Sequence, residues 1–123
     1  MKIFIPWDHM ASSNKRNQRR GGKAHGWRYK LSREAIRMIG LASTPRGRPV
    51  YGDGVPVAVD LTFYPPDMRR RDVSNLLKVI FDGLQGSVYS DDYQIAEFRV
   101  RRMAPHREEP GCVVEVTELA DSG

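Results

Sequence analysis

The sequence lacks several features that would each point to a particular class of protein. It contains a single cysteine, Cys112, which excludes an intrachain disulfide and a cysteine zinc cluster. No apolar run approaches the length that spans a membrane. The apolar opening, residues 1–5, is too short for a signal peptide and has no small-residue cleavage site after it. We therefore expect a soluble protein of the reducing cytoplasm, with no membrane partner.

The signatures of several catalytic classes are also missing. No Walker or GxGxxG loop is present, which argues against a nucleotide cofactor. His9, His25 and His106 lack the HxxxH or HExxH spacing of a zinc site. Cys112 lies in an alternating segment and is predicted to be a small core residue rather than a nucleophile.

Charge is divided unevenly along the chain. The first fifty residues contain twelve Lys and Arg against two acids, whereas the remainder contains eight against thirteen. This asymmetry predicts a phosphate-binding arm beside a carboxylate site. Residues 8–30, poor in aliphatic side chains, are predicted to form a long basic loop, in which Trp27 and Tyr29 either stack on bases or anchor its end. Its predicted DNA contacts are Asn14, Lys15, Arg16, Arg19, Arg20 and Lys23; the alternative is a merely solvated loop.

Hydrophobic periodicity predicts the secondary structure. Strands are expected at about 2–5, 55–64, 95–103 and 112–116, and helices at 33–41, capped by Ser32, and about 72–84. This order predicts an α+β fold: a single domain over residues 1–123 with a small mixed β-sheet and helices packed mainly on one face. The order of the strands in the sheet does not follow from the sequence.

The segment 66–102 carries the most informative pattern. Within the expected helix at 72–84, one face is apolar and the other carries Asn75, Lys78 and Asp82. Three arginines and an aspartate lead into this helix, and two aspartates follow it: Arg69, Arg70, Arg71 and Asp72, then Asp91 and Asp92.

This set of residues is suited to the hydrolysis of a phosphodiester. Carboxylates of Asp72, Asp91 and Asp92 are the hard oxygen ligands that Mg²⁺ or Mn²⁺ prefers. Lys78 can contact the scissile phosphate as a point charge, and the three arginines can hold flanking phosphates. Each residue has a structural alternative: Asp72 as a helix N-cap, Lys78 as the partner of Asp82 in an exposed pair, and the two later aspartates as a turn. Composition and spacing leave both interpretations open.

Several spaced motifs together resemble the RusA family of Holliday-junction resolvases. The segment 72–78 is similar to the family pattern DxDNxxK, residues 82–84 to D-(A/G)-L, and residues 91–95 to DD-x-Q-(I/V). The opening Ile-Pro-Trp at residues 5–7 and the basic residues after Ser13 are similar to the family's N-terminus.

The resemblance implies a homodimeric, Mg²⁺-dependent endodeoxyribonuclease, with Mn²⁺ as a possible substitute. Such an enzyme resolves four-way DNA junctions by symmetrical paired nicks, in DNA recombination and repair and often in phages or prophages. Carried over by motif, Asp72 and Asp92 are metal ligands, Lys78 is the catalytic lysine, and Asp91 is the other member of the acidic pair.

One position departs from the family pattern. Ser74 stands where the family has its second aspartate, and a hydroxyl binds a metal ion only weakly, directly or through water. Asp82, about three helical turns from Asp72, is expected to be too distant to replace it. The leading hypothesis is an active resolvase; the alternatives are a branched-DNA-binding protein that has lost cleavage through Ser74, and a structural protein whose basic loop binds an acidic partner.

Overall fold

The computed structural model describes residues 1–10, 22–44, 49–69 and 73–119, with residues 22–26 described by their backbone alone. Four strands form one mixed sheet in the order β1-β4-β2-β3: β1 (Lys2–Pro6), β2 (Val57–Tyr64), β3 (Ile95–Arg102) and β4 (Gly111–Glu118). Strand β4 is antiparallel to both of its neighbours, whereas β2 and β3 are parallel. Because parallel strands need a crossover, helix α4 (Val73–Leu84) connects β2 to the short 3₁₀ helix η2 (Asp92–Gln94), which leads into β3.

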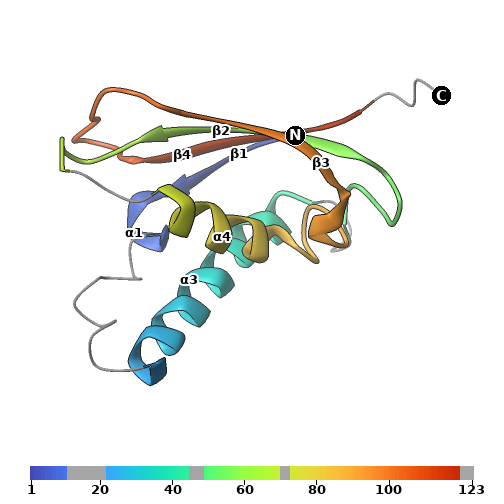
Figure 1. Ribbon diagram of the computed structural model, residues 1–123, viewed down its shortest axis with the longest axis horizontal. Helices are drawn as coiled ribbons and strands as arrows, with labels where there is room; N and C mark the ends of the chain where they lie inside the picture. Colours follow the sequence, from blue (N-terminus) through green and yellow to red (C-terminus); the bar gives the residue numbers. More distant parts are fainter. Residues whose placement is uncertain (11–21, 45–48, 70–72, 120–123) are drawn as a thin grey trace.

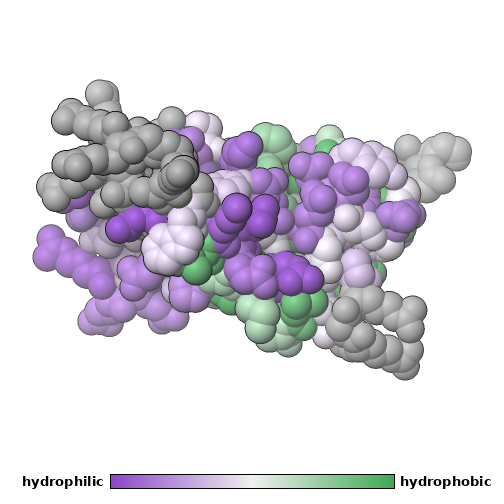
Figure 2. Space-filling model, turned by 90° about the horizontal axis from the view of Figure 1, so that it is seen from below, coloured by the Kyte–Doolittle hydropathy of each residue, from purple (hydrophilic) through white to green (hydrophobic). Residues whose placement is uncertain are grey.

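Helices α1 (Trp7–Met10), α3 (Gly22–Ala42) and α4 all lie on one face of the sheet (Figure 1). This arrangement confirms the predicted α+β fold with its helices on one side. Seen from the helix side, the surface is largely hydrophilic, with apolar side chains in small patches (Figure 2). Within the described part of the chain, no helix is both long and apolar enough to cross a membrane.

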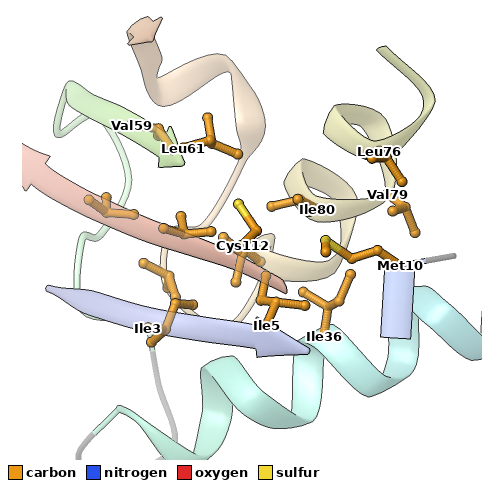
Figure 3. Packing of buried hydrophobic residues seen from close by; sticks show 14 of the residues in the cluster. Ile3, Ile5, Met10, Ile36, Val59, Leu61, Leu76, Val79, Ile80 and Cys112 are labelled. Atoms are coloured by element: carbon orange, nitrogen blue, oxygen red, sulfur yellow. The ribbon is translucent and has the colours of Figure 1, made fainter. Parts of the chain in front are cut away.

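The hydrophobic core fills the space between the sheet and the helices. Alternate residues of β2 and β4 are buried, and they meet the apolar faces of α3 and α4 (Figure 3). Cys112 lies in this core, where burial raises the pKa of its thiol to about 12. The prediction that Cys112 is a small core residue is therefore confirmed.

The prediction of a loop at residues 8–30 is wrong for two parts of that range. Residues 8–10 belong to α1 and residues 22–30 to α3, while residues 11–21 lie outside the described residues. The helix expected at 33–41 therefore begins eleven residues earlier, at Gly22, and Ser32 is buried inside it instead of capping it. Glycine spacing suggested a break, but packing of α3 against α4 supplies stability that the local sequence does not encode.

Close packing of α3 on α4 depends on a glycine. A Cβ atom added at Gly83 would lie 2.7 Å from the Cβ of Ile36 and 3.1 Å from the carbonyl oxygen of Arg33. One neighbour is a backbone oxygen and the other is a Cβ atom, which is fixed by the backbone. Neither atom can therefore move away by a side-chain rotation. The glycine after Asp82 thus sets the distance between the two helices, which positions the polar face of α4.

We expect Gly83→Ala to destabilise the protein by about 1–3 kcal/mol, because overpacking outweighs the gain of up to about 1 kcal/mol in helix propensity. Urea unfolding would measure the change. Gly52→Ala is the matched control, since an added Cβ there meets nothing within 4 Å. Equal stability of the two variants would contradict this account of the helix contact.

Candidate active site

Helix α4 presents a row of polar side chains away from the core. Ser74, Lys78 and Asp82 are spaced four residues apart, so they lie one above the other on the same face. Ser74 and Lys78 are exposed, and Asp82 is half-buried. Lys78 forms no ion pair with any described residue, so the exposed pair with Asp82 is not formed. The ammonium group is therefore available to an anionic ligand.

The two adjacent aspartates lie in a tight turn after α4. Gly86 adopts a positive φ of 89° and redirects the chain at the end of the helix. Tyr89 is fully buried beneath the turn, and its hydroxyl donates a hydrogen bond of 2.6 Å to the carbonyl of Phe81. Asp91 then caps η2, with its carboxylate accepting the N–H of Tyr93 at 3.2 Å. The structure thus places the pair at the start of a 3₁₀ helix, with Asp91 as its N-cap and Asp92, an exposed residue, as its first member.

Gln94 holds this acidic turn in place. Its side chain is only 3% exposed, and its Oε1 accepts the N–H groups of Ser90 and Asp91, both at 2.9 Å. Its Nε2 donates to the carbonyls of Gly52 at 2.7 Å and Val55 at 2.9 Å. One amide therefore joins the acidic turn to the connector that precedes β2.

Negative charge is concentrated around Asp92. Its carboxyl pKa is raised by desolvation first, then by the hydrogen bond and charge of Asp91, and then by the charge of Asp82. Asp82 thus acts electrostatically on Asp92, at the C-terminal end of α4. A divalent cation would relieve this repulsion, and carboxylate oxygens are the ligands that Mg²⁺ prefers.

Asp82 is also bound by a residue from α3. The hydroxyl of Tyr29 donates a hydrogen bond to Oδ2 of Asp82, and the tyrosine pKa is raised by burial and by this carboxylate. Tyr29 was expected at the end of a loop as a base-stacking or anchoring residue; the structure gives it an anchoring contact. Trp27, in contrast, is exposed on α3.

Of the predicted metal ligands, the structure describes Asp91, Asp92 and Ser74 but not Asp72. Asp92 lies at the C-terminal end, where its N–H donates to Oε1 of Gln85 at 3.3 Å. Asp72 lies outside the described residues, but in the sequence it directly precedes Val73, the first residue of α4. Twelve helical residues span about 18 Å. In the described part of the chain, no three His, Cys, Asp or Glu residues come close enough to hold one ion.

The predicted DNA-binding residues are mostly untested by the structure. Those outside the described residues are Asn14, Lys15, Arg16, Arg19, Arg20, Arg70 and Arg71, and Lys23 is described by its backbone alone. Arg69 is exposed, and its N–H donates to Oδ1 of Asp67 at 2.8 Å. It lines a shallow depression together with Val73 and Arg102, beside the start of α4.

Gln94 was given no role by the sequence reasoning, although a signal was present. Residues 91–94 read Asp-x-x-Gln, the pattern of a helix capping box, and the structure forms that box. The electrostatic role of Asp82 had no comparable signal, because it depends on how the turn folds back towards the end of α4.

Comparison with known proteins connects this chain to an enzyme family. The family model described as Endodeoxyribonuclease RusA matches residues 6–117. A crossover junction endodeoxyribonuclease RusA of Escherichia coli K12 is 31% identical, with 82% of this chain and 81% of the relative covered. A relative of the same name from Enterobacteria phage 82 is 30% identical over the same shares. Another, from E. coli O139:H28, is 29% identical over 97% of this chain and 95% of the relative.

We expect Gln94→Ala to lower the free energy of unfolding by about 2–4 kcal/mol, because each buried group left without a hydrogen bond costs about 1–3 kcal/mol. Chemical denaturation would measure the loss. Gln85→Ala is the control: this exposed residue accepts one long hydrogen bond, and its removal should cost less than about 1 kcal/mol. Similar losses for both variants would show that Gln94 does not hold the turn.

Asp92→Asn should raise the Tm at neutral pH in EDTA. A raised pKa in the folded state means that ionisation of Asp92 opposes folding. This cost is absent below the ordinary aspartate pKa, grows as the pH rises through the raised value, and is fully present above it. The gain in Tm should therefore shrink as the pH falls towards about 4. A matching gain for Asp53→Asn, on the exposed connector, would show that the effect is not local to the turn.

Proposed function

The chain belongs to the RusA family of endodeoxyribonucleases, and from this premise we propose that it is a metal-dependent enzyme that resolves four-way DNA junctions by paired nicks. The observation that carries the proposal is the acidic turn at residues 91–92. The turn is fixed by Gln94, and the pKa of Asp92 is raised by desolvation and by neighbouring carboxylates. Rigidly held, mutually repelling carboxylates, near the end of a helix that also presents the exposed Lys78, favour a cation and a phosphate over a purely structural role.

Each polar residue has a distinct part in the proposed reaction. Asp72, Asp91 and Asp92 would hold Mg²⁺, or Mn²⁺ in its place, with Ser74 as a weak ligand. The ion, when bound, supplies positive charge to the scissile phosphate and acidifies a water molecule. Lys78 adds a second positive charge and orients the phosphate, because its ammonium group faces outward from α4 without a described partner.

The position of the ligands favours a homodimer with shared sites. Asp92 lies at the C-terminal end of α4, whereas Asp72 directly precedes the first residue of that helix in the sequence, and the twelve residues of α4 span about 18 Å. In the proposed dimer, a two-fold axis would bring the acidic turn of each copy to the start of α4 in the other. Such a dimer carries two equivalent sites, which suits the two equivalent strands cut in a junction.

Junction binding would depend mainly on phosphate contacts. The basic residues of the first fifty positions, together with Arg69 beside the start of α4, suit a DNA backbone rather than particular bases. The presence of a phage relative of the same name is compatible with processing of branched phage DNA.

A non-catalytic branched-DNA-binding protein is the second candidate. Ser74 favours it, because the loss of one carboxylate from the family motif removes a negative charge from the proposed site. The two candidates differ only in cleavage, so a nicking assay separates them.

Nicking of a synthetic four-way junction, compared with a matched linear duplex, would test the proposal. We expect paired nicks on the junction with Mg²⁺ or Mn²⁺ and none with EDTA. Asp72→Asn and Asp92→Asn should each lower the rate by at least about a hundredfold, since even removal of a partner outside the metal's own ligands costs ten- to hundredfold. Junction binding, followed by gel shift, should persist in both variants. Tight binding without cutting in either metal would replace the resolvase with the non-catalytic candidate.

Shared sites predict a further result in the same assay. Co-expression of Asp72→Asn and Asp92→Asn chains with different tags gives mixed dimers in which one site carries both substitutions and the other carries neither. These purified mixed dimers should make single nicks, whereas each variant alone makes none. Mixed dimers that stay inactive would place each site within one chain and leave the proposed activity intact.

A further inference from the structure

The connection between β2 and α4 presents one large apolar side chain to solvent. Met68 is 78% exposed, the highest value among the exposed large apolar residues of the described chain. It follows Pro65, Pro66 and Asp67, and it precedes Arg69. Single exposed apolar residues are common on protein surfaces, so exposure alone does not indicate a function. What distinguishes Met68 is the way the connection holds it and the charge that surrounds it.

The base of this connection is anchored to the hairpin between β3 and β4. Pro65 is buried, and its carbonyl accepts the N–H of His106 at 2.8 Å. The ring of His106 also packs edge-on against Tyr64, the last residue of β2, with centroids 6.4 Å apart. Figure 1 shows the hairpin and the connection at the same end of the sheet. Two consecutive prolines restrict the backbone further, because each fixes its own φ.

A local turn fixes the backbone on both sides of Met68. Oδ1 of Asp67 accepts the N–H of Arg69 at 2.8 Å, which is the contact that defines an Asx turn. Met68 is the residue between these two, so it lies at the tip of the turn. Because this backbone is already ordered, binding of a ligand by the tip requires little further loss of conformational entropy.

The surroundings of Met68 are positively charged. Arg69 and Arg102 line the depression at the start of α4, and Lys78 is exposed on that helix. The carboxylate of Asp67 already accepts a backbone hydrogen bond within the turn. An apolar tip next to cations suits a ligand that combines phosphates with flat apolar surfaces, as DNA does where its bases are unstacked.

We propose that Met68 is a wedge that enters the branch point of a DNA junction and packs against the base pairs there. This step rests on the proposed function. Proteins insert apolar side chains, methionine among them, between base steps and partly unstack them. In a linear duplex the full stacking energy opposes insertion, whereas stacking between the arms of a junction is already interrupted. Met68 therefore discriminates a junction from a linear duplex, while the cations bind the phosphates of both.

The side chain of methionine suits an irregular gap between base pairs. It is unbranched and polarisable, so it adapts its shape to the surface that it meets and makes favourable contacts with aromatic rings. Charged neighbours such as Arg69 bind phosphates but add little apolar contact to a base. The pairing of one apolar tip with adjacent cations thus divides recognition between the branch point and the DNA backbone.

A protein partner is a less suitable occupant of this surface. The core of a protein interface is a contiguous apolar patch. Met68 is the one exposed large apolar residue in the described part of the connection, residues 65–69. Its sequence neighbours, Asp67 and Arg69, are charged. A single apolar side chain among charges matches insertion into a stack better than docking on a flat protein surface.

Fluorescence of 2-aminopurine would test the wedge in the full-length protein. This base analogue replaces an adenine beside the branch point of a synthetic four-way junction, and its emission rises when it unstacks from its neighbours. The measurement is made in EDTA, where no cleavage is expected, with enough protein to saturate the DNA. Wild-type protein should raise the emission. The same analogue in the middle of one arm, or in a linear duplex, should not respond.

Met68→Ala should abolish the rise in emission and weaken junction binding by about tenfold, because it removes most of an apolar side chain from the contact. Binding to the linear duplex should stay unchanged. Met68→Leu should restore the emission, whereas Met68→Gln, similar in length but polar, should not. Met38→Ala is the matched control, since Met38 is 57% exposed on α3 and should have no part in the contact. Circular dichroism would establish that each variant is folded.

Two results would overturn the wedge. One is an emission rise that is the same in Met68→Ala as in the wild type when both saturate the junction. The other is an equal loss of affinity for the junction and for the linear duplex, which would make Met68 a general contribution to DNA binding.

Nicking of the same junction separates the wedge from the proposed function. If the wild type makes paired nicks but its emission does not depend on Met68, the wedge is rejected and the resolvase stands. If emission depends on Met68 but no nick is made, the wedge stands in the non-catalytic candidate. Equal binding of junction and linear duplex with no change in emission would reject both proposals.

Discussion

The side-chain amide of Gln94 makes the hydrogen bonds on which the acidic turn depends. Five backbone groups, two from the turn and three from the connector before β2, converge on one buried side chain. This arrangement allows two adjacent carboxylates to be held close to Asp82 despite their mutual repulsion. Unfavourable repulsion between carboxylates is typical of sites that bind a cation, because the positive charge of the bound ion offsets it.

The second constraint is the distance between α3 and α4. Gly83 brings the helices so close that even one added carbon atom would meet Ile36, and Tyr29 then reaches Asp82 from the neighbouring helix. The apolar face of α4 is buried by the sheet on one side and by α3 on another. Its remaining face, with Ser74 and Lys78, is exposed to solvent.

Sheet topology sets where α4 lies relative to the edge strand. Insertion of β4 between β1 and β2 leaves β3 at the edge, with α4 running beneath it in the opposite direction (Figure 1). The ring of Phe81 on α4 contacts that of Phe98 on β3, with centroids 5.4 Å apart, so the helix and the edge strand pack together.

The sequence by itself determined the four strands, the helix α4, the core position of Cys112 and the motifs that indicated the family, because alternation, helical periodicity and residue spacing are local properties. Tertiary structure decided the rest. The early start of α3 depends on its contact with α4, and the strand order depends on pairing between distant segments. The role of Gln94 and the effect of the Asp82 charge on the pKa of Asp92 both require the chain to fold back on itself. Hydrogen bonds and electrostatic interactions depend on distance in space and not on separation in the sequence.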